Sequence, residues 1–158
     1  MKQLLIFFLF FTFSVHAQQF SNVDSKVKRY PAYKSAQRLA NKITSDFNND
    51  GDKIRAAFTW LTHNIRYDLT AYFNPTSKKI SFTYSNEEDK QLKLQQIKNQ
   101  VIDEMFSSRK SVCEGYAQSF KKICDLLHIE SVVIKGYARN STGEIGTIPT
   151  TSNHAWNA

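Results

Sequence analysis

Two short motifs near the end of the chain combine residue types that can carry out covalent chemistry. Cys-Glu-Gly-Tyr-Ala at residues 113–117 opens a segment whose apolar residues have helical spacing, and His-Ala-Trp-Asn occupies residues 154–157. A thiol at the start of a helix and an imidazole on a strand are the groups that a cysteine nucleophile and its base require. The alternative is a small buried thiol and a histidine satisfied in the core.

A helix start suits Cys113 as a nucleophile. The unpaired N–H groups and the positive dipole end of a first turn favour the thiolate form of a thiol placed there. The backbone N–H of Cys113 is also placed to donate to a developing oxyanion. Gly115 and Ala117 keep this turn slim, which helps a substrate chain to reach the sulfur.

His154 is the expected base, and its neighbours complete the expected site. His154 and Trp156 share one face of a strand because side chains alternate, so Trp156 can form a wall beside the imidazole. Glu114 follows the nucleophile and can tune its charge, although a solvated carboxylate favoured by the helix dipole explains it equally well. The expected substrate and oxyanion neighbourhood consists of Glu114, Gly115, Tyr116 and Trp156.

The elements that must position these residues follow from the spacing of apolar side chains. Helices are predicted over residues 36–47, 54–65, 87–105 and 113–127. The inward residues expected for the second helix are Ile54, Ala57, Phe58, Leu61 and Ile65, and those for the third are Leu94, Ile97, Val101 and Met105. Residues 66–86 form a predicted long aromatic loop with a short strand at 80–84.

Strands are expected only after these helices. Residues 131–137 contain a continuous apolar run, which predicts a strand buried on both faces, and the last strand begins near Asn153. Helices followed by strands indicate an α+β fold.

The two cysteines, Cys113 and Cys124, lie on one predicted helix. Eleven residues at the helical rise separate them by about 16 Å. A disulfide needs Cα atoms within about 7 Å, so an internal bridge is excluded. Cys124 and His128 have a spacing that can hold a metal, but only two such ligands are local, so no metal site and no cofactor are predicted.

The first residues resemble an export signal. Lys2 precedes an apolar run from Leu4 to Val15, and Val15-His16-Ala17 fits a small-x-small cleavage pattern. The run is shorter than the about 20 apolar residues of a spanning helix. We therefore predict a signal peptide over residues 1–17, an extended polar lead-in over 18–31, and a secreted or periplasmic product without a transmembrane segment.

The chain is basic, with a formal net charge of +7. An exported basic domain is drawn to acidic surfaces, such as anionic envelope polymers, although a solvated surface with a cationic bias explains the charge as well. The chain has no basic motif interleaved with aromatic residues, and export also argues against nucleic-acid binding.

Several separated motifs together resemble the transglutaminase-like superfamily. The matching strings are Cys113–Ala117, Phe120, Ile123–Cys124, Gly136–Tyr137, His154–Asn157 and the upstream stretch Ala57–Asp68. This resemblance implies a papain-like core over residues 32–158, in which a helix carrying the nucleophile Cys113 packs on an antiparallel sheet carrying the base His154. It also implies an Asp on the next strand, which this chain does not contain, so the chain is expected to be a C-terminally incomplete fragment.

The resemblance leaves two functions open. The first is an exported cysteine acyl-transfer enzyme that attacks peptide or glutamine-type amides through a thioester. Water as acceptor gives a protease or amidase, an amine acceptor gives crosslinking, and export favours hydrolysis slightly. The second is a catalytically inactive module of the same fold that binds a protein or an envelope surface.

Overall fold

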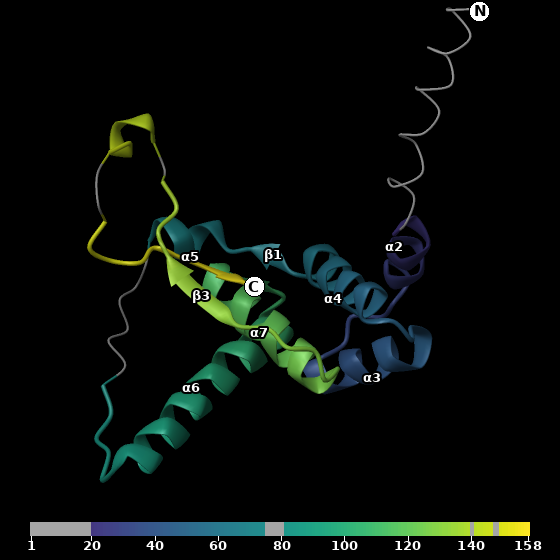
Figure 1. Ribbon diagram of the computed structural model, residues 1–158, viewed down its shortest axis with the longest axis horizontal. Coiled ribbons are helices and arrows are strands. Elements are labelled where there is room, and N and C mark those ends of the chain that lie inside the picture. The colour runs from purple at the N-terminus through teal and green to yellow at the C-terminus, as the bar shows by residue number, and fades with distance from the viewer. Residues whose placement is uncertain (1–19, 75–80, 140, 147–148) are drawn as a thin grey trace, which may run out of the picture.

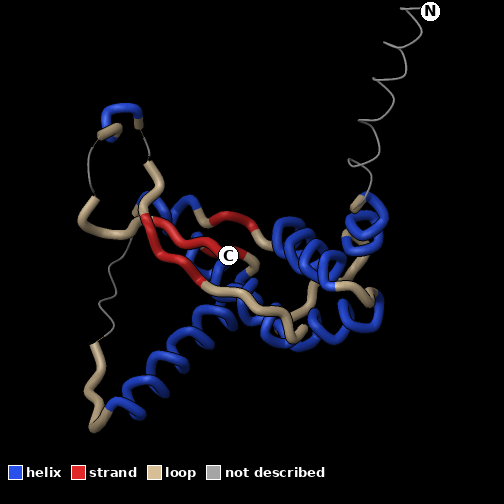
Figure 2. Tube along the Cα trace, in the orientation of Figure 1, coloured by secondary structure: helices blue, strands red, loops and turns tan. Residues whose placement is uncertain are grey.

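The computed structural model describes residues 20–74, 81–139, 141–146 and 149–158. Helices dominate the first part of the chain and the described strands are short, as the predicted α+β class requires (Figures 1 and 2). The helices are α2 (Ser21–Val27), α3 (Ala36–Asp46), α4 (Asp50–Asn64), α5 (Leu69–Phe73), α6 (Glu87–Ser108), α7 (Cys113–Leu126) and the 3-10 turn η1 (Thr142–Glu144). The strands are β1 (Arg66–Tyr67), β2 (Lys110–Ser111), β3 (Val133–Gly136) and β4 (His154–Asn157). None of the described helices is long and apolar enough to cross a bilayer.

The core lies where α3, α4, the end of α6 and α7 meet. Trp60 of α4 is fully buried and stacks on Phe106 of α6, with ring centroids 5.4 Å apart. Leu39 and Ile43 of α3 and Ile123 of α7 fill the same core. Burial of these large side chains is the main force that holds the helices together.

The prediction of an extended lead-in is wrong for residues 21–27, because these residues form α2. Val23 and Val27 of this helix are buried in the common core. Asp24 accepts hydrogen bonds from Arg55 and Thr59 of α4, at 2.6 Å from Arg55 Nη2 and 2.6 Å from Thr59 Oγ1. The folded unit therefore begins before residue 32. A short helix with two apolar residues, Val23 and Val27, is enough to pack on α4. The predicted signal peptide lies outside the described residues.

The inward face predicted for α4 is partly wrong. Ala57, Leu61 and Ile65 are buried, but Ile54 and Phe58 are exposed. Trp60 and Thr59 take the buried positions because α2 covers that side and Trp60 Nε1 donates to the Pro31 carbonyl at 3.1 Å. Tertiary packing has thus rotated the buried face away from the one that periodicity favoured.

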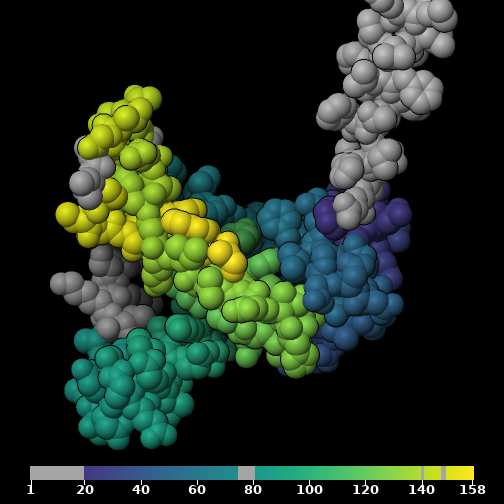
Figure 3. Space-filling model, viewed as in Figure 1, coloured from purple at the N-terminus to yellow at the C-terminus, as the bar shows by residue number. Residues whose placement is uncertain are grey.

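The predicted third helix is confirmed as α6, but only its last turns are buried. Met105 is inward as expected, together with Ile102 and Phe106, whereas Leu94, Ile97 and Val101 are half-buried. The first half of α6 projects away from the helical body (Figure 3), so its apolar residues have few neighbours. Among residues 66–74 the predicted loop contains β1 and α5, and residues 81–84 form no strand; residue 80 lies outside the described residues.

Arg109 ends α6 and joins distant parts of the chain. Its backbone is left-handed, with φ of 61°. Its guanidinium lies over Trp60, 5.4 Å from the ring centroid, and Nη2 donates to the carbonyls of Ala32 and, at 2.6 Å, Tyr33. The turn between α6 and β2 is therefore fixed to the N-terminal segment.

Two pairs of strands flank α7. β1 and β2 are parallel, with Arg66 opposite Lys110, and β3 and β4 are antiparallel, with Gly136 opposite His154. The antiparallel pair packs on α7 as predicted, since Ala155 is 6% exposed and Asn157 Nδ2 donates to the Ala117 carbonyl at 3.0 Å. The prediction that residues 131–137 are buried on both faces is wrong, because α7 covers only one face and Val132 and Ile134 are exposed.

Candidate active site

Helix α7 begins at Cys113, as the sequence predicted. The residue before it, Val112, is extended and provides no side-chain cap for the first turn. β2 leads directly into this turn and is fixed by β1, because the Arg66 and Asp68 N–H groups donate to the Arg109 and Ser111 carbonyls at 3.0 and 2.9 Å. Cys113 is half-buried and is a free thiol.

His154 begins β4, and residues on both sides fix its strand. Asn153 donates its backbone N–H to the Gly136 carbonyl at 2.9 Å, and its side-chain amide exchanges two hydrogen bonds with the backbone of Ala138, at 2.8 and 3.0 Å. Trp156 stacks on the imidazole with ring centroids 6.0 Å apart. Its indole also covers Gly136, where an added Cβ would lie 2.9 Å from Cζ3 of the ring, so a side chain at that position would displace the indole.

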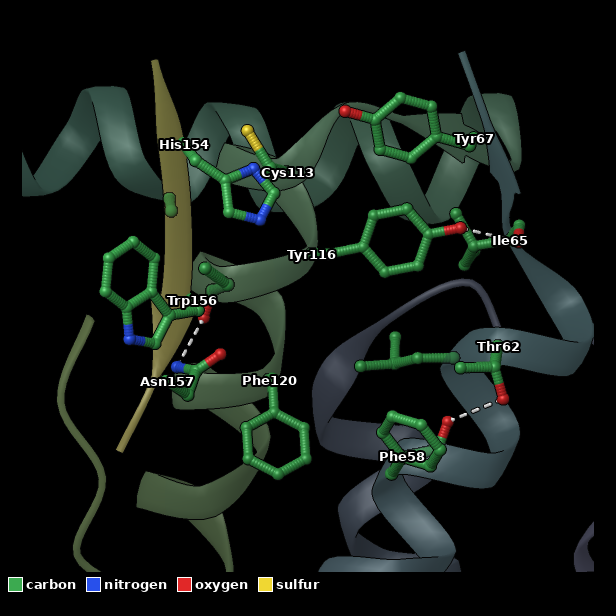
Figure 4. A pocket seen from close by; sticks show the side chains of 13 residues that line it. Phe58, Thr62, Ile65, Tyr67, Cys113, Tyr116, Phe120, His154, Trp156 and Asn157 are labelled. Atoms are coloured by element: carbon green, nitrogen blue, oxygen red, sulfur yellow. Dashed lines mark hydrogen bonds between the residues drawn. The ribbon is translucent and has the colours of Figure 1, made fainter. Parts of the chain in front are cut away.

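The structure brings Cys113, His154, Tyr116 and Trp156 to one groove of about 660 Å³. Cys113 and His154 lie side by side at one end of it, and Trp156 follows along β4 (Figure 4). The opposite wall comes from α4, and α7 supplies the floor. A thiol and an imidazole that line one accessible groove are the two groups that a cysteine nucleophile and its base require.

Two of the predicted neighbours, Glu114 and Gly115, do not line this groove. Glu114 pairs with Lys135 of β3 at 3.2 Å and accepts from Gln118 Nε2 at 2.9 Å, so its carboxylate ties α7 to the sheet. Gly115 is buried against β2, and a Cβ there would lie 2.9 Å from the Ser111 Cβ. Gly115 therefore allows the helix start to approach β2, rather than widening the way to the sulfur.

The chain matches a known protein family. The model of the transglutaminase-like superfamily matches residues 37–158. The chain belongs to the transglutaminase-like superfamily. It is 24% identical over 146 residues to a kyphoscoliosis peptidase from Homo sapiens and 22% identical over 140 residues to one from Mus musculus. These alignments cover 92% and 88% of this chain but only 19% and 18% of the relatives, so the chain spans less than a fifth of their length.

A comparison with solved structures gave no significant match. The family model therefore shows the superfamily, and the placement of the groove residues is known from this structure alone.

Tyr67 is a residue of this transglutaminase-like site that sequence reasoning missed. It lines the groove and stacks on Tyr116, with ring centroids 6.3 Å apart, and the Tyr116 hydroxyl donates to the Ile65 carbonyl at 2.7 Å. Burial raises the pKa of Tyr67, the nearby Cys113 thiol raises it further, and a hydrogen bond with the Cys113 backbone acts in the opposite direction. Tyr67 was part of a matching string, but nothing in its local spacing indicated that the chain would bring it to the thiol.

Asp68 does not complete the site. It caps α5 by accepting from the Ala71 N–H at 3.1 Å and pairs with Lys110 at 3.1 Å. The Ala71 hydrogen bond and Lys110 together lower the pKa of Asp68. Among the described residues that line the groove, none is an Asp or a Glu that could orient His154.

Cys124 is separated from this chemistry. It lies on the core side of α7, where it is 1% exposed, and burial raises its pKa to about 11. His128, just after α7, has a left-handed backbone, with φ of 59°. Within the described part of the chain, no group of three or more His, Cys, Asp or Glu residues is placed to hold a metal ion.

Proposed function

We propose that the protein is a cysteine acyl-transfer enzyme that attacks peptide or glutamine-type amides. Cys113 is the nucleophile, His154 is the base and then the acid, and the backbone N–H of Cys113 donates to the oxyanion. Tyr67, next to that N–H, is the second polar group at the attacked carbonyl. The name of the two relatives, kyphoscoliosis peptidase, is consistent with this proposal.

Two steps complete the proposed reaction. The thiolate attacks the amide carbon, the C–S bond forms, and the C–N bond breaks as His154 gives its proton to the leaving nitrogen. His154 then takes a proton from water as the water oxygen attacks the thioester carbon. The C–S bond breaks, His154 gives that proton to the sulfur, and the carboxylic acid leaves. An amine in place of water gives a crosslink, and we favour hydrolysis slightly for an exported protein.

One observation carries the proposal: Cys113 and His154 reach the same end of one groove from a helix start and a strand start that are 41 residues apart in sequence. Each partner is held by backbone pairing of its own, β1–β2 for Cys113 and β3–β4 for His154. Preformed placement of this kind is what lowers the barrier of a bimolecular step.

The test is the covalent intermediate. Intact-mass measurement after mixing with a panel of peptides and small glutamine amides is expected to detect an acylated protein for the natural sequence and for Cys124→Ala. Cys113→Ala is expected to give none, and His154→Ala to slow acylation by at least about 100-fold. Equal acylation of all four proteins, or none in any, would contradict the enzyme.

A binding module of the same fold is the second candidate. The observation in its favour is that no described carboxylate lining the groove can orient His154. This module would bind a partner protein with the same affinity after Cys113→Ser, and its Cys113 would be alkylated by iodoacetamide no faster than a model thiol.

We also propose export, with cleavage after Ala17, and attraction of the mature basic chain to an acidic envelope surface. Removal of residues 1–17 takes away one charge, that of Lys2, from the net +7 and leaves +6. N-terminal sequencing of the product from a secreting host is expected to begin at Gln18. Binding to an anionic polymer is expected to weaken as salt is raised and to be unaffected by Cys113→Ala.

A further inference from the structure

The groove continues well past the thiol as an apolar channel. Phe58 of α4, Phe120 of α7 and Trp156 of β4 face it (Figure 4). Phe58 is 50% exposed and Trp156 is 41% exposed, although both have large apolar surfaces. Large apolar side chains that face an open groove from three different elements mark a place where a ligand can bury them.

Two polar groups along this channel already have partners within the protein. The Thr62 hydroxyl donates to the Phe58 and Thr59 carbonyls at 3.0 and 3.1 Å. Asn157 Nδ2 donates to the Ala117 carbonyl at 3.0 Å. Among the described residues lining the groove none is Lys, Arg, Asp or Glu, so a charged side chain entering it would lose water without gaining an ion pair.

The walls of the channel are held in place. The Arg55 guanidinium lies 5.6 Å from the centre of the Phe58 ring and is itself paired with Asp24 at 2.6 Å. Trp156 packs between the His154 ring and the bare backbone of Gly136. Phe58 and Trp156 therefore form a preformed surface, and a ligand does not have to order them on binding.

We propose that this channel selects the substrate: it takes a large apolar side chain, aromatic or branched aliphatic, from a residue flanking the carbonyl that Cys113 attacks. The inference rests on the proposed function, because the channel and the thiol share one groove. It names the substrate class as apolar peptide segments and excludes acidic and basic residues at the same position.

A peptide series tests the selection. Residues up to two positions on either side of the attacked amide are varied among Phe, Leu, Ala, Asp and Lys, and kcat/KM is measured. At one of these positions Phe or Leu is expected to exceed Asp and Lys by about 10- to 100-fold, the range that a hydrophobic pocket provides.

Variants of the wall connect the preference to the channel. Phe58→Ala is expected to reduce the preference for Phe over Ala in the peptide by about 5- to 10-fold, and Phe58→Lys is expected to improve turnover of the Asp peptide. Leu92→Ala is the matched control, because Leu92 is 58% exposed on α6 and does not line the groove. The rate of alkylation by iodoacetamide, which is too small to need the channel, is expected to be the same in all of these proteins.

Binding to Cys113→Ala separates this inference from the enzyme proposal. Calorimetry with the same peptides is expected to show tighter binding of the apolar ones, and Phe58→Ala in that background is expected to remove the difference. That result would support the channel even if no peptide acylated the natural protein. Equal binding of all peptides would overturn the inference, as would a change in oligomeric mass on Phe58→Ala without any selectivity, which would mean that a second copy covers the groove.

Discussion

Helix α7 carries a thiol near each of its ends, and the two thiols have different surroundings. At the first residue, Cys113 is half-buried beside His154 and Tyr67 in an open groove. Three turns later, Cys124 is 1% exposed among core side chains, and its pKa is raised to about 11. The thiol at the start can be reached from the groove, whereas the thiol near the end is buried and stays protonated.

The difference teaches that position in the fold, rather than residue type, decides the chemistry of each cysteine. The start of α7 is attached to β2 and opens on a groove between α4 and β4, while Ile123 and Leu127 near its end lie in the core with residues of α3, α4 and α6. One helix therefore supplies an accessible thiol at one end and is anchored by apolar packing at the other.

The largest expected effect separates the two thiols directly. Iodoacetamide in excess at pH 7 is expected to alkylate one site in the folded protein and two in denaturant, with the native modification on Cys113 at least about 1,000-fold faster than on Cys124. Peptide mapping by mass spectrometry locates the label. The comparison would break if Cys124 in Cys113→Ala were alkylated as fast as Cys113 in Cys124→Ala.

The core end of the helix is expected to control stability. Ile123→Ala removes a fully buried side chain and is expected to lower the free energy of unfolding by about 2–5 kcal/mol. Urea unfolding followed by circular dichroism measures this loss. Phe58→Ala on the open groove is the matched truncation and is expected to cost less than about 1 kcal/mol, so similar losses would show that the groove wall is part of the core.

The start of the helix depends on the close approach of Gly115 to Ser111. Gly115→Ala is expected to cost about 1–3 kcal/mol, because the added Cβ overlaps the Ser111 side chain. It is also expected to slow acylation of Cys113, two residues away in the first turn of the same helix. Ser111→Gly combined with Gly115→Ala should restore most of both losses, and failure of the double variant to recover would place the strain elsewhere.

The smallest expected effect is the alkaline sensitivity that Cys124 contributes. Its folded pKa of about 11 is above that of an unfolded thiol, so the folded state holds this proton more tightly. The stability it contributes is complete below the unfolded pKa and is lost as pH rises from about 9 to 11, by on the order of 1–2 kcal/mol. Unfolding of Cys124→Ala across this range is expected to lack that part of the slope, and identical slopes in both proteins would contradict the assignment.

Local patterns in the sequence predicted the helix start and the strand that carry Cys113 and His154. They predicted less well how distant elements pack around these residues. The start of α7 at Cys113 and the strand at His154 follow from periods within short stretches. Trp60 was not expected to be central, because its burial depends on α2 and on Pro31, both distant in sequence. The place of Tyr67 beside the thiol could not be predicted, since it depends on the pairing of β1 with β2 across 44 residues.

The contacts of Arg109 make the surroundings of Cys113 depend on the N-terminal segment. Only three residues separate Arg109 from Cys113, and the guanidinium is held by the carbonyls of Ala32 and Tyr33 and by the face of Trp60. A nascent chain in which α7 has formed but the N-terminal helices have not yet folded would carry Cys113 without the contacts that fix the start of α7. The accessibility of Cys113 is therefore expected to report assembly of the N-terminal helices, and a pulse of alkylating agent during refolding would record when the Arg109 contacts form.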